Sequence, residues 1–216
     1  MFRYLLTVLM LASLGCAAQH GQLAITPTRI EEAKKTLEID YKVIGAPMPE
    51  LRLLRFRDTT QKEVPAPEPA PVAEKKGRKG KRPVIKKSDA AGMDRKFLTS
   101  KDFDNGANLI IMMFNPTCSH CEDETELLEK NIFLFTKSKL ILMANPMMQE
   151  YIPNFARSFN VTQYRTITLG VDSGDFITKT FIYGALPQIN IYSRDRKLLR
   201  TFSGETSIDS LKNYIE

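Results

Sequence analysis

FNPTCSHCE, residues 114–122, is the stretch on which the rest of the sequence depends. It follows an apolar run at 109–113 and precedes a segment at 122–137 in which apolar residues recur with helical spacing. This pattern predicts a buried strand, a tight turn and a helix whose first turn carries Cys118 and Cys121. A C-x-x-C at such a strand-to-helix junction is the arrangement of a thiol–disulfide redox site.

The spacing of the two cysteines has a physical reason. Residues three apart on a helix lie on one face, so the two sulfurs can approach bonding distance. Cys118 would lie where backbone N–H groups are unpaired and the helix dipole is positive, which favours the nucleophilic thiolate. A protonated His120 between the sulfurs would favour that thiolate further. We therefore expect Cys118 to attack a substrate disulfide and Cys121 to resolve the mixed disulfide, with His120 as a third catalytic residue.

Two other interpretations of the cysteines compete with a redox site. A structural zinc ion needs four ligands, and beside the two cysteines the chain offers only the histidines His20 and His120 for this ion. Free cysteines are also common in cores, but the place of this pair at a helix start argues against an inert role. We therefore expect no metal at this site.

The segment at 114–122 resembles the active site of thioredoxin-fold proteins and is most similar to the envelope thiol–disulfide oxidoreductases of the TlpA/ResA type. Three further features occur in the order that this group shows. They are a Gly-x-x-Ala-Pro-like entry at 44–51 (IGAPMPEL), a cis-proline-like segment at 185–192 (ALPQINIY), and a hairpin at 193–197 with a closing glycine at 202–204. The resemblance covers about residues 43–216, apart from one insertion.

This resemblance, together with alternating strand and helix patterns, implies a three-layer α/β/α thioredoxin-like fold with a mixed central sheet and a C-terminal antiparallel hairpin. It also implies that the Leu186–Pro187 bond is cis and faces the C-x-x-C. We expect Leu186 and Pro187 to bind substrate, with the backbone of Leu186 pairing with a substrate peptide. Such a protein needs no metal or organic cofactor, because the dithiol carries the two electrons.

The resemblance implies a thiol–disulfide oxidoreductase, chiefly a reductase of protein or small-molecule disulfides that a membrane redox partner re-reduces. A thioredoxin-like binding or scaffold module with weak redox activity is a second interpretation. Two departures motivate it: the buried acid of thioredoxin would fall at Met112, and the acidic residues at 122–126 work against a thiolate at Cys118. A thiol peroxidase is a third, although the Pro-x-x-x-Thr-x-x-Cys signature of peroxiredoxins is absent.

Residues 1–18 have the basic residue, apolar run and small residues of a secretory signal peptide. Cleavage after Ala18 would leave a soluble protein, which we favour. Cleavage before Cys16 would leave a lipid-anchored protein, although SLGC at 13–16 only loosely matches a bacterial lipobox. Either route predicts a protein of the periplasm or cell envelope, where disulfide chemistry is permitted.

Two further segments are expected to lie outside the core of the domain. Residues 19–42 form a lead-in, either a short helix or a mobile tether. Residues at about 60–91 are predicted to be a disordered insertion, because a proline-alternating stretch precedes eight Lys and Arg residues. This insertion could contact an acidic surface or anionic lipid, or be a solvated loop without a partner. Apart from these eight, the chain has 23 basic and 25 acidic residues and is close to neutral. We therefore expect no nucleic-acid partner.

Met147 and Met148 have two possible roles: they could line a groove for a partner or fill the core.

The remaining pattern predicts the elements of the domain. The predicted elements are an edge strand at 50–58, a short helical turn at 100–103, a central strand at 109–114, a helix at 122–137 with Cys121, Leu128, Ile132 and Phe135 on its buried stripe, a strand at 140–144, a helix at 150–159 with Pro153 in its first turn, a strand or inter-helix link at 166–171, a helix at 175–181, hairpin strands at 188–193 and 198–203, and a helix at 207–215.

Overall fold

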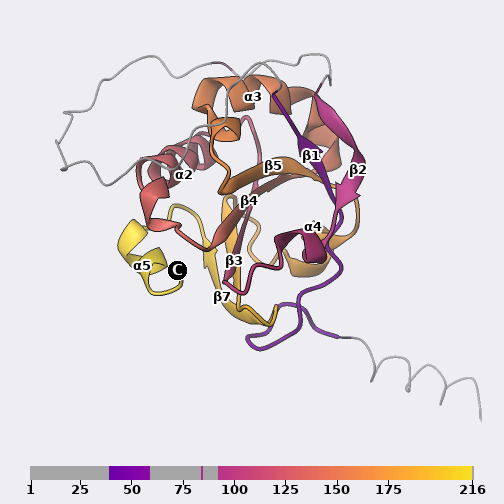
Figure 1. Ribbon diagram of the computed structural model, residues 1–216, viewed down its shortest axis with the longest axis vertical. Helices are drawn as coiled ribbons and strands as arrows, with labels where there is room; N and C mark the ends of the chain where they lie inside the picture. Colours follow the sequence, from indigo (N-terminus) through magenta and orange to yellow (C-terminus); the bar gives the residue numbers. More distant parts are fainter. Residues whose placement is uncertain (1–38, 59–83, 85–91, 216) are drawn as a thin grey trace, which may run out of the picture. The chain divides into compact units, whose positions relative to one another are not determined.

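A seven-stranded mixed sheet organises the chain, in the order β2-β1-β5-β4-β3-β6-β7. This computed structural model describes residues 39–58, 84 and 92–215 (Figure 1). The predicted signal peptide, most of the lead-in and nearly all of the predicted insertion lie outside the described residues, so those predictions stay open. The strands are β1 (Leu53–Phe56), β2 (Met93–Leu98), β3 (Leu109–Phe114), β4 (Lys139–Ala144), β5 (Ile167–Asp172), β6 (Gln188–Tyr192) and β7 (Leu198–Ser203).

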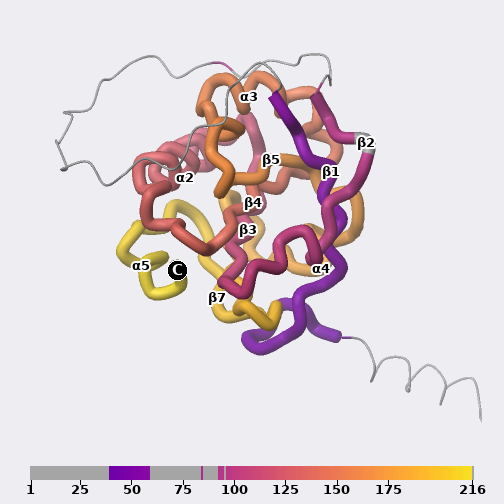
Figure 2. Tube along the Cα trace, viewed as in Figure 1, coloured from indigo at the N-terminus to yellow at the C-terminus, as the bar shows by residue number. Residues whose placement is uncertain are grey.

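Strands β3, β4 and β5 are parallel neighbours, and the other pairings are antiparallel. The path of the chain between them can be followed in Figure 2. Within the described part, no helix is both long enough and apolar enough to cross a membrane. The helices are α2 (Ser119–Lys130), α3 (Ile152–Phe159), α4 (Phe176–Thr180) and α5 (Ile208–Lys212), and the 3-10 turns are η1 (Ser100–Phe103), η2 (Ile132–Leu134), η3 (Pro146–Tyr151) and η4 (Val161–Gln163).

The sheet has an apolar cluster on each face, which makes three layers. Alternate residues of β3 divide between the clusters: Ile110 and Met112 join the helices α2, α3 and α5 on one face, and Leu109 and Ile111 join α4 and η1 on the other. Every residue of β3 is buried, as expected for a central strand covered on both faces. The predicted three-layer α/β/α class with a C-terminal antiparallel hairpin is therefore confirmed.

Several predicted elements are found close to their expected bounds. The proline at position 153 lies in the first turn of α3, where its missing N–H costs no helical hydrogen bond. The segment at 166–171, for which a strand and an inter-helix link were both open, forms β5. The short turn at 100–103, the helix at 175–181 and the two hairpin strands are also confirmed.

Three predictions about elements are wrong in position or length. Strand β1 is not at the edge of the sheet, because β2 pairs with its free side. Helix α2 ends at Lys130, so Ile132 and Phe135 are buried beyond it, at turn η2, instead of on its stripe. The last helix, α5, covers only five residues of the range 207–215, and Ser207 caps it by accepting a hydrogen bond from the Ser210 N–H.

The close approach of β1 and β5 depends on Gly170. A Cβ atom at this position would lie 2.4 Å from the carbonyl oxygen of Leu54 and 3.0 Å from Cγ of Leu53. Because both contacts are shorter than van der Waals distances, any side chain at residue 170 would push the two strands apart. The strand pair thus tolerates only glycine at this point.

We expect Gly170→Ala to lower the free energy of unfolding by about 1 to 3 kcal/mol, the usual cost of overpacking. The matched control is Gly184→Ala, since a Cβ there would meet nothing within 4 Å. Chemical denaturation of both variants measures the difference. Equal stability of the two variants would contradict the close approach.

Candidate active site

The turn between β3 and α2 holds the first cysteine in place. The side-chain oxygen of Asn115 accepts hydrogen bonds from the backbone N–H of Thr117 at 2.9 Å and from its hydroxyl at 3.0 Å. The backbone carbonyl of Asn115 also accepts the N–H of Cys118 at 3.0 Å. This short polar turn therefore fixes the backbone directly before Cys118.

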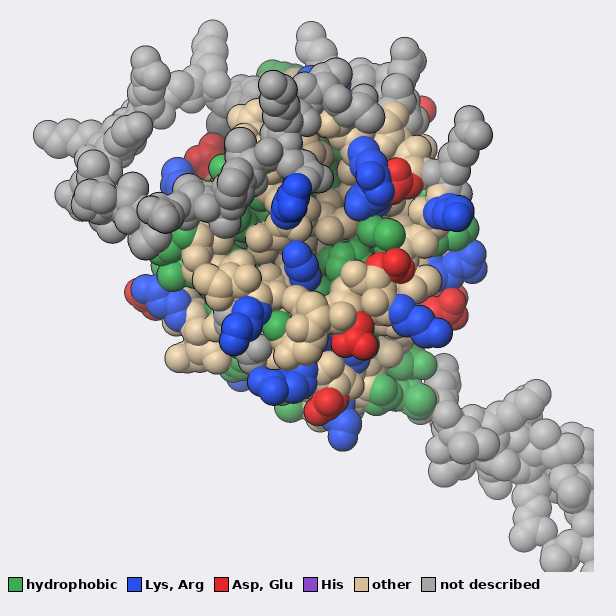
Figure 3. Space-filling model, in the orientation of Figure 1, with side chains coloured by type: hydrophobic (Ala, Val, Ile, Leu, Met, Phe, Trp, Pro, Cys, Tyr) green, Lys and Arg blue, Asp and Glu red, His purple; other side chains and the backbone are tan. Residues whose placement is uncertain are grey.

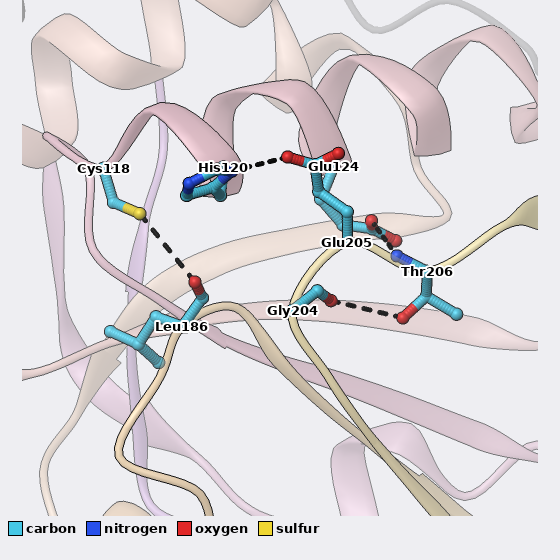
Figure 4. A network of polar contacts seen from close by, with 7 residues as sticks. All are labelled: Cys118, His120, Glu124, Leu186, Gly204, Glu205 and Thr206. Carbon is cyan, nitrogen blue, oxygen red and sulfur yellow. Dashed lines mark hydrogen bonds and ion pairs between the residues drawn. The ribbon is translucent and has the colours of Figure 1, made fainter.

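Cys118 is the N-cap residue of α2 and is half-buried. It stands at the end of the helix where the dipole favours negative charge, although its side chain makes no cap hydrogen bond. Its thiol donates to the carbonyl oxygen of Leu186 at 3.9 Å (Figure 4). The described structure has the pair in the dithiol form.

Cys121 differs sharply from Cys118 in its surroundings. It is fully buried, and its sulfur accepts a hydrogen bond from the backbone N–H of Asn115 at 3.5 Å. Burial raises the pKa of the Cys121 thiol well above its usual range, and the Asn115 N–H only partly opposes this rise. One thiol is therefore accessible and the other is protected.

The Leu186–Pro187 peptide bond is cis, as the resemblance predicted. Its segment opposes the start of α2, since the Leu186 carbonyl accepts the Cys118 thiol and the Pro187 carbonyl accepts the N–H of Gly204 at 2.8 Å. The predicted site residues Cys118, Leu186 and Pro187 are therefore together. Their predicted contact with substrate stays a prediction.

His120 is exposed on the first turn of α2, and its Nδ1 lies 2.5 Å from Oε1 of Glu205. Glu205 belongs to the loop between β7 and α5, 85 residues away along the chain. The sequence analysis did not identify Glu205, because no local pattern connects the two residues. Only the folded sheet brings this loop beside the C-x-x-C.

Glu124 is a buried acid that the sequence analysis grouped with an acidic helix start. Its side chain is only 1% exposed. One oxygen accepts the Thr206 N–H at 2.8 Å, and the other is buried without a hydrogen-bond partner among the described residues. Burial raises the pKa of Glu124 to about 7; the Thr206 N–H lowers it and the Glu205 charge raises it further.

The signal for Glu124 was present in the sequence. Residues 121, 124 or 125, and 128 share one face of a helix, and Cys121 and Leu128 had already been assigned to the buried face. Position 112, where thioredoxin has its buried acid, holds a buried methionine, and the buried acid Glu124 lies on a different element.

The methionine pair after β4 is divided between the two expected roles. Met148 packs against the core, whereas Met147 is 87% exposed. Because β3 and β4 are parallel, with Phe114 opposite Ala144, the turn that carries Met147 leaves the sheet at the same edge as Cys118. An apolar side chain is therefore available to a partner at this edge.

Three side chains near the dithiol could hold a cation. The ligand atoms of His120, Asp123 and Glu205 all lie within 4.8 Å of one another. One imidazole nitrogen and two carboxylate oxygens are fewer than the four protein ligands of a structural zinc site, so this cluster alone assigns no metal. This set does not include the cysteines, so it differs from the zinc site considered from the sequence.

A hollow among the described residues lies away from the dithiol. It has a volume of about 530 Å³ and is lined by Arg55, Arg57 and Arg165, together with the first residues of β5. The C-x-x-C follows the opposite, carboxyl-terminal end of the parallel strands, so this hollow is remote from the dithiol. On the face of the molecule that Figure 3 shows, the Lys and Arg side chains lie interspersed with Asp and Glu side chains.

The described part of the chain is a thioredoxin-like α/β protein with a dithiol at the start of a helix opposite a cis-proline. No family model and no curated protein matches the sequence. Solved structures do match, among them a candidate protein disulfide isomerase from Bacteroides thetaiotaomicron, with 18% identity, coverage of 82% of this chain and 91% of that chain, and a TM-score of 0.52.

A candidate thiol:disulfide interchange protein DsbE from Chlorobium tepidum matches with 11% identity, coverage of 80% of this chain and 95% of that chain, and a TM-score of 0.51. At such identities the likeness establishes the shared fold. The activity of this chain has to be argued from its own site.

The buried Glu124 should make stability depend on pH. Its pKa rises on folding from an ordinary 4.5 to about 7, so between these pH values the folded chain binds more protons than the unfolded chain. The free energy of unfolding must then fall as pH rises through this interval. Between pH 5 and pH 8 we expect wild type to lose on the order of 1 to 3 kcal/mol more than Glu124→Gln loses.

Urea denaturation at several pH values measures this difference, and any pH-independent cost of the amide cancels. Glu129, whose pKa burial also raises, to about 8, keeps part of the dependence in both proteins. Asp209→Asn, which changes an exposed acid, is the control and should leave the slope unchanged. Parallel slopes for wild type and Glu124→Gln would contradict the burial argument.

Proposed function

We propose that this chain is a thiol–disulfide oxidoreductase that acts outside the cytoplasm through Cys118 and Cys121. The observation that carries the proposal is the unequal environment of the two thiols. Cys118 is accessible at a helix N-terminus and faces the cis Leu186–Pro187 bond, whereas Cys121 is buried behind it. A fold shared with two proteins named for disulfide chemistry supports the proposal.

The reaction proceeds in two exchanges. The Cys118 thiolate attacks one sulfur of a substrate disulfide, the substrate S–S bond breaks, and the departing sulfur takes up a proton. Cys121 then loses its proton and attacks Sγ of Cys118, which forms the Cys118–Cys121 disulfide and releases the second substrate thiol. The substrate gains two electrons and two protons, and the protein loses them.

Burial makes the second exchange depend on a base. Because burial raises the pKa of Cys121, its thiol does not ionise unaided near neutral pH. Glu124 lies one turn further along the same helix face, is buried, and has a pKa of about 7. We assign it as the proton acceptor for Cys121, since a base works best when its pKa is close to the working pH.

The substrate is expected to be a peptide or small-molecule disulfide. The backbone of Leu186 and the cis Pro187 would hold the chain that flanks the substrate disulfide, and the exposed Met147 offers an apolar contact at the same edge. In the cell, the predicted signal peptide at 1–18 would bring the protein to the periplasm or envelope, with Cys16 as an alternative lipid anchor. A membrane redox partner would then return Cys118 and Cys121 to the dithiol.

The acidic surroundings of the helix start support a scaffold role. Asp123 and Glu205 lie close to His120, and negative charge disfavours a thiolate. The reduction potential of the pair decides between the two roles, measured in a glutathione series on protein beginning at Gln19. A reversible, strongly negative potential indicates a reductase, a potential near those of oxidants indicates a disulfide donor, and failure to equilibrate supports the scaffold.

We expect Cys121→Ser to accumulate a mixed disulfide between Cys118 and a disulfide-bonded model peptide, because the resolving thiol is missing. Cys118→Ser should form almost none, since its remaining thiol is fully buried. Mass spectrometry of the intact protein measures both adducts, and circular dichroism checks that each variant is folded. A folded Cys121→Ser that forms no adduct would contradict the proposed function.

A further inference from the structure

Three consecutive residues after β7 connect the parts of the candidate site. The N–H of Gly204 donates to the Pro187 carbonyl at 2.8 Å, and the N–H of Thr206 donates to Glu124 at 2.8 Å. Glu205, between them, reaches His120 (Figure 4). Gly204 has a φ of +74°, a conformation that favours glycine. The loop is therefore fastened on both sides of Glu205, to the cis-proline segment and to α2.

The contact between Glu205 and His120 is not explained by stability. Their side chains are 55% and 66% exposed, and exposed ion pairs contribute little to the free energy of unfolding. Yet their separation is only 2.5 Å, and His120 lies between the two cysteines in the sequence. A contact that adds little stability but involves the residue between the two cysteines points to a role in the chemistry.

The geometry determines which nitrogen of His120 faces away from the loop. A carboxylate can only accept a hydrogen bond, so Nδ1 of His120 must carry the proton that Glu205 receives. Nε2 is then the nitrogen left to exchange a proton with another group. In the view of Figure 4 the imidazole lies between Cys118 and Glu205.

We propose that Glu205 is a positioning residue of the redox site, which holds His120 with Nε2 available to Cys118. This inference rests on the proposed function and deepens it. Nε2 accepts the proton of the Cys118 thiol, and Glu205 balances the positive charge that the ring acquires. The thiolate attacks the substrate disulfide, the new S–S bond forms as the old one breaks, and the departing sulfur takes the proton from Nε2.

Two carboxylates face His120, and they act differently. Asp123 comes from the same helix as His120, whereas Glu205 comes from the loop after β7 and is hydrogen-bonded to the ring. The cis-proline segment opposite, residues 184–188, contains no ionisable side chain. If Glu205 acted on Cys118 only through its charge, its removal would favour the thiolate. If it acts through His120, its removal disfavours the thiolate, so the two effects have opposite signs.

The test compares Glu205→Gln with Glu126→Gln in the full chain, with a chelator present so that no metal ion occupies the three side chains. Glu126 is an exposed acid on α2 that pairs with Lys130, so its variant removes the same charge without touching His120. The readout is the rate of Cys118 alkylation as a function of pH. We expect Glu205→Gln to move the midpoint up by about half a pH unit and Glu126→Gln to leave it unchanged or slightly lower.

A second pair of measurements isolates the imidazole. In a His120→Ala background, Glu205→Gln should no longer raise the midpoint. The chain contains only two histidines, so ¹⁵N spectra can report the tautomer of His120 directly. We expect a proton on Nδ1 in wild type and a loss of that preference in Glu205→Ala.

The outcomes separate the two proposals. A midpoint that stays or falls in Glu205→Gln, while wild type still exchanges disulfides, overturns the role of Glu205 and leaves the proposed function intact. The same shift in the His120→Ala background would also overturn it, because the effect would not pass through the ring. A wild type whose Cys118 and Cys121 never cycle between dithiol and disulfide overturns the proposed function itself.

Discussion

The position of β3 in the middle of the sheet is the constraint on which the site depends. β3 is hydrogen-bonded to β4 on one edge and to β6 on the other, and both of its faces are buried. The end of β3 therefore cannot move independently of the sheet, and it determines where Cys118 begins the next helix. The cis-proline segment comes directly before β6. The pairing of β3 with β6 therefore brings this segment to the end of β3, next to Cys118. Cys118 and the backbone that faces it are thus placed by one strand.

The acidic residues around the dithiol divide into different physical classes. Glu124 is buried, and its pKa of about 7 means that it is only partly ionised near neutral pH. It therefore adds less negative charge than the sequence implies. Glu205 is exposed but hydrogen-bonded to a ring that can become positive. The total charge of the segment at 122–126 is therefore a poor guide to the electrostatic potential at Cys118. What matters is which acids are ionised and which cations they meet.

Sequence reasoning succeeded where the information is local. The strand, turn and helix around the C-x-x-C, the cis-proline segment and the hairpin after it are each encoded by a few neighbouring residues, and the structure has them all. It failed where distant segments meet. The neighbour of β1 follows more than 30 residues later in the chain, so nothing near β1 indicates that β2 covers its edge. Glu205 lies 85 residues from His120, and no single sequence reveals that contact. Glu124 is intermediate, because helical spacing alone could have assigned it to the buried face.

The pairing of β1 with β2 has a consequence for how this protein could change. The N–H of Arg57 donates to the Gly92 carbonyl at 2.8 Å, and Arg55 and Arg57 both pair with Asp94. These contacts close the two ends of the intervening segment at the border of the sheet, with three strands between that border and β3. The entropy of closing a loop grows only with the logarithm of its length, about 0.6 kcal/mol per doubling. This border can therefore accept added sequence, such as a tether, an affinity tag or a binding module, while the end of the sheet that carries Cys118 and Cys121 keeps its geometry. Sequence added at this border and the residues around the dithiol can therefore change independently of each other.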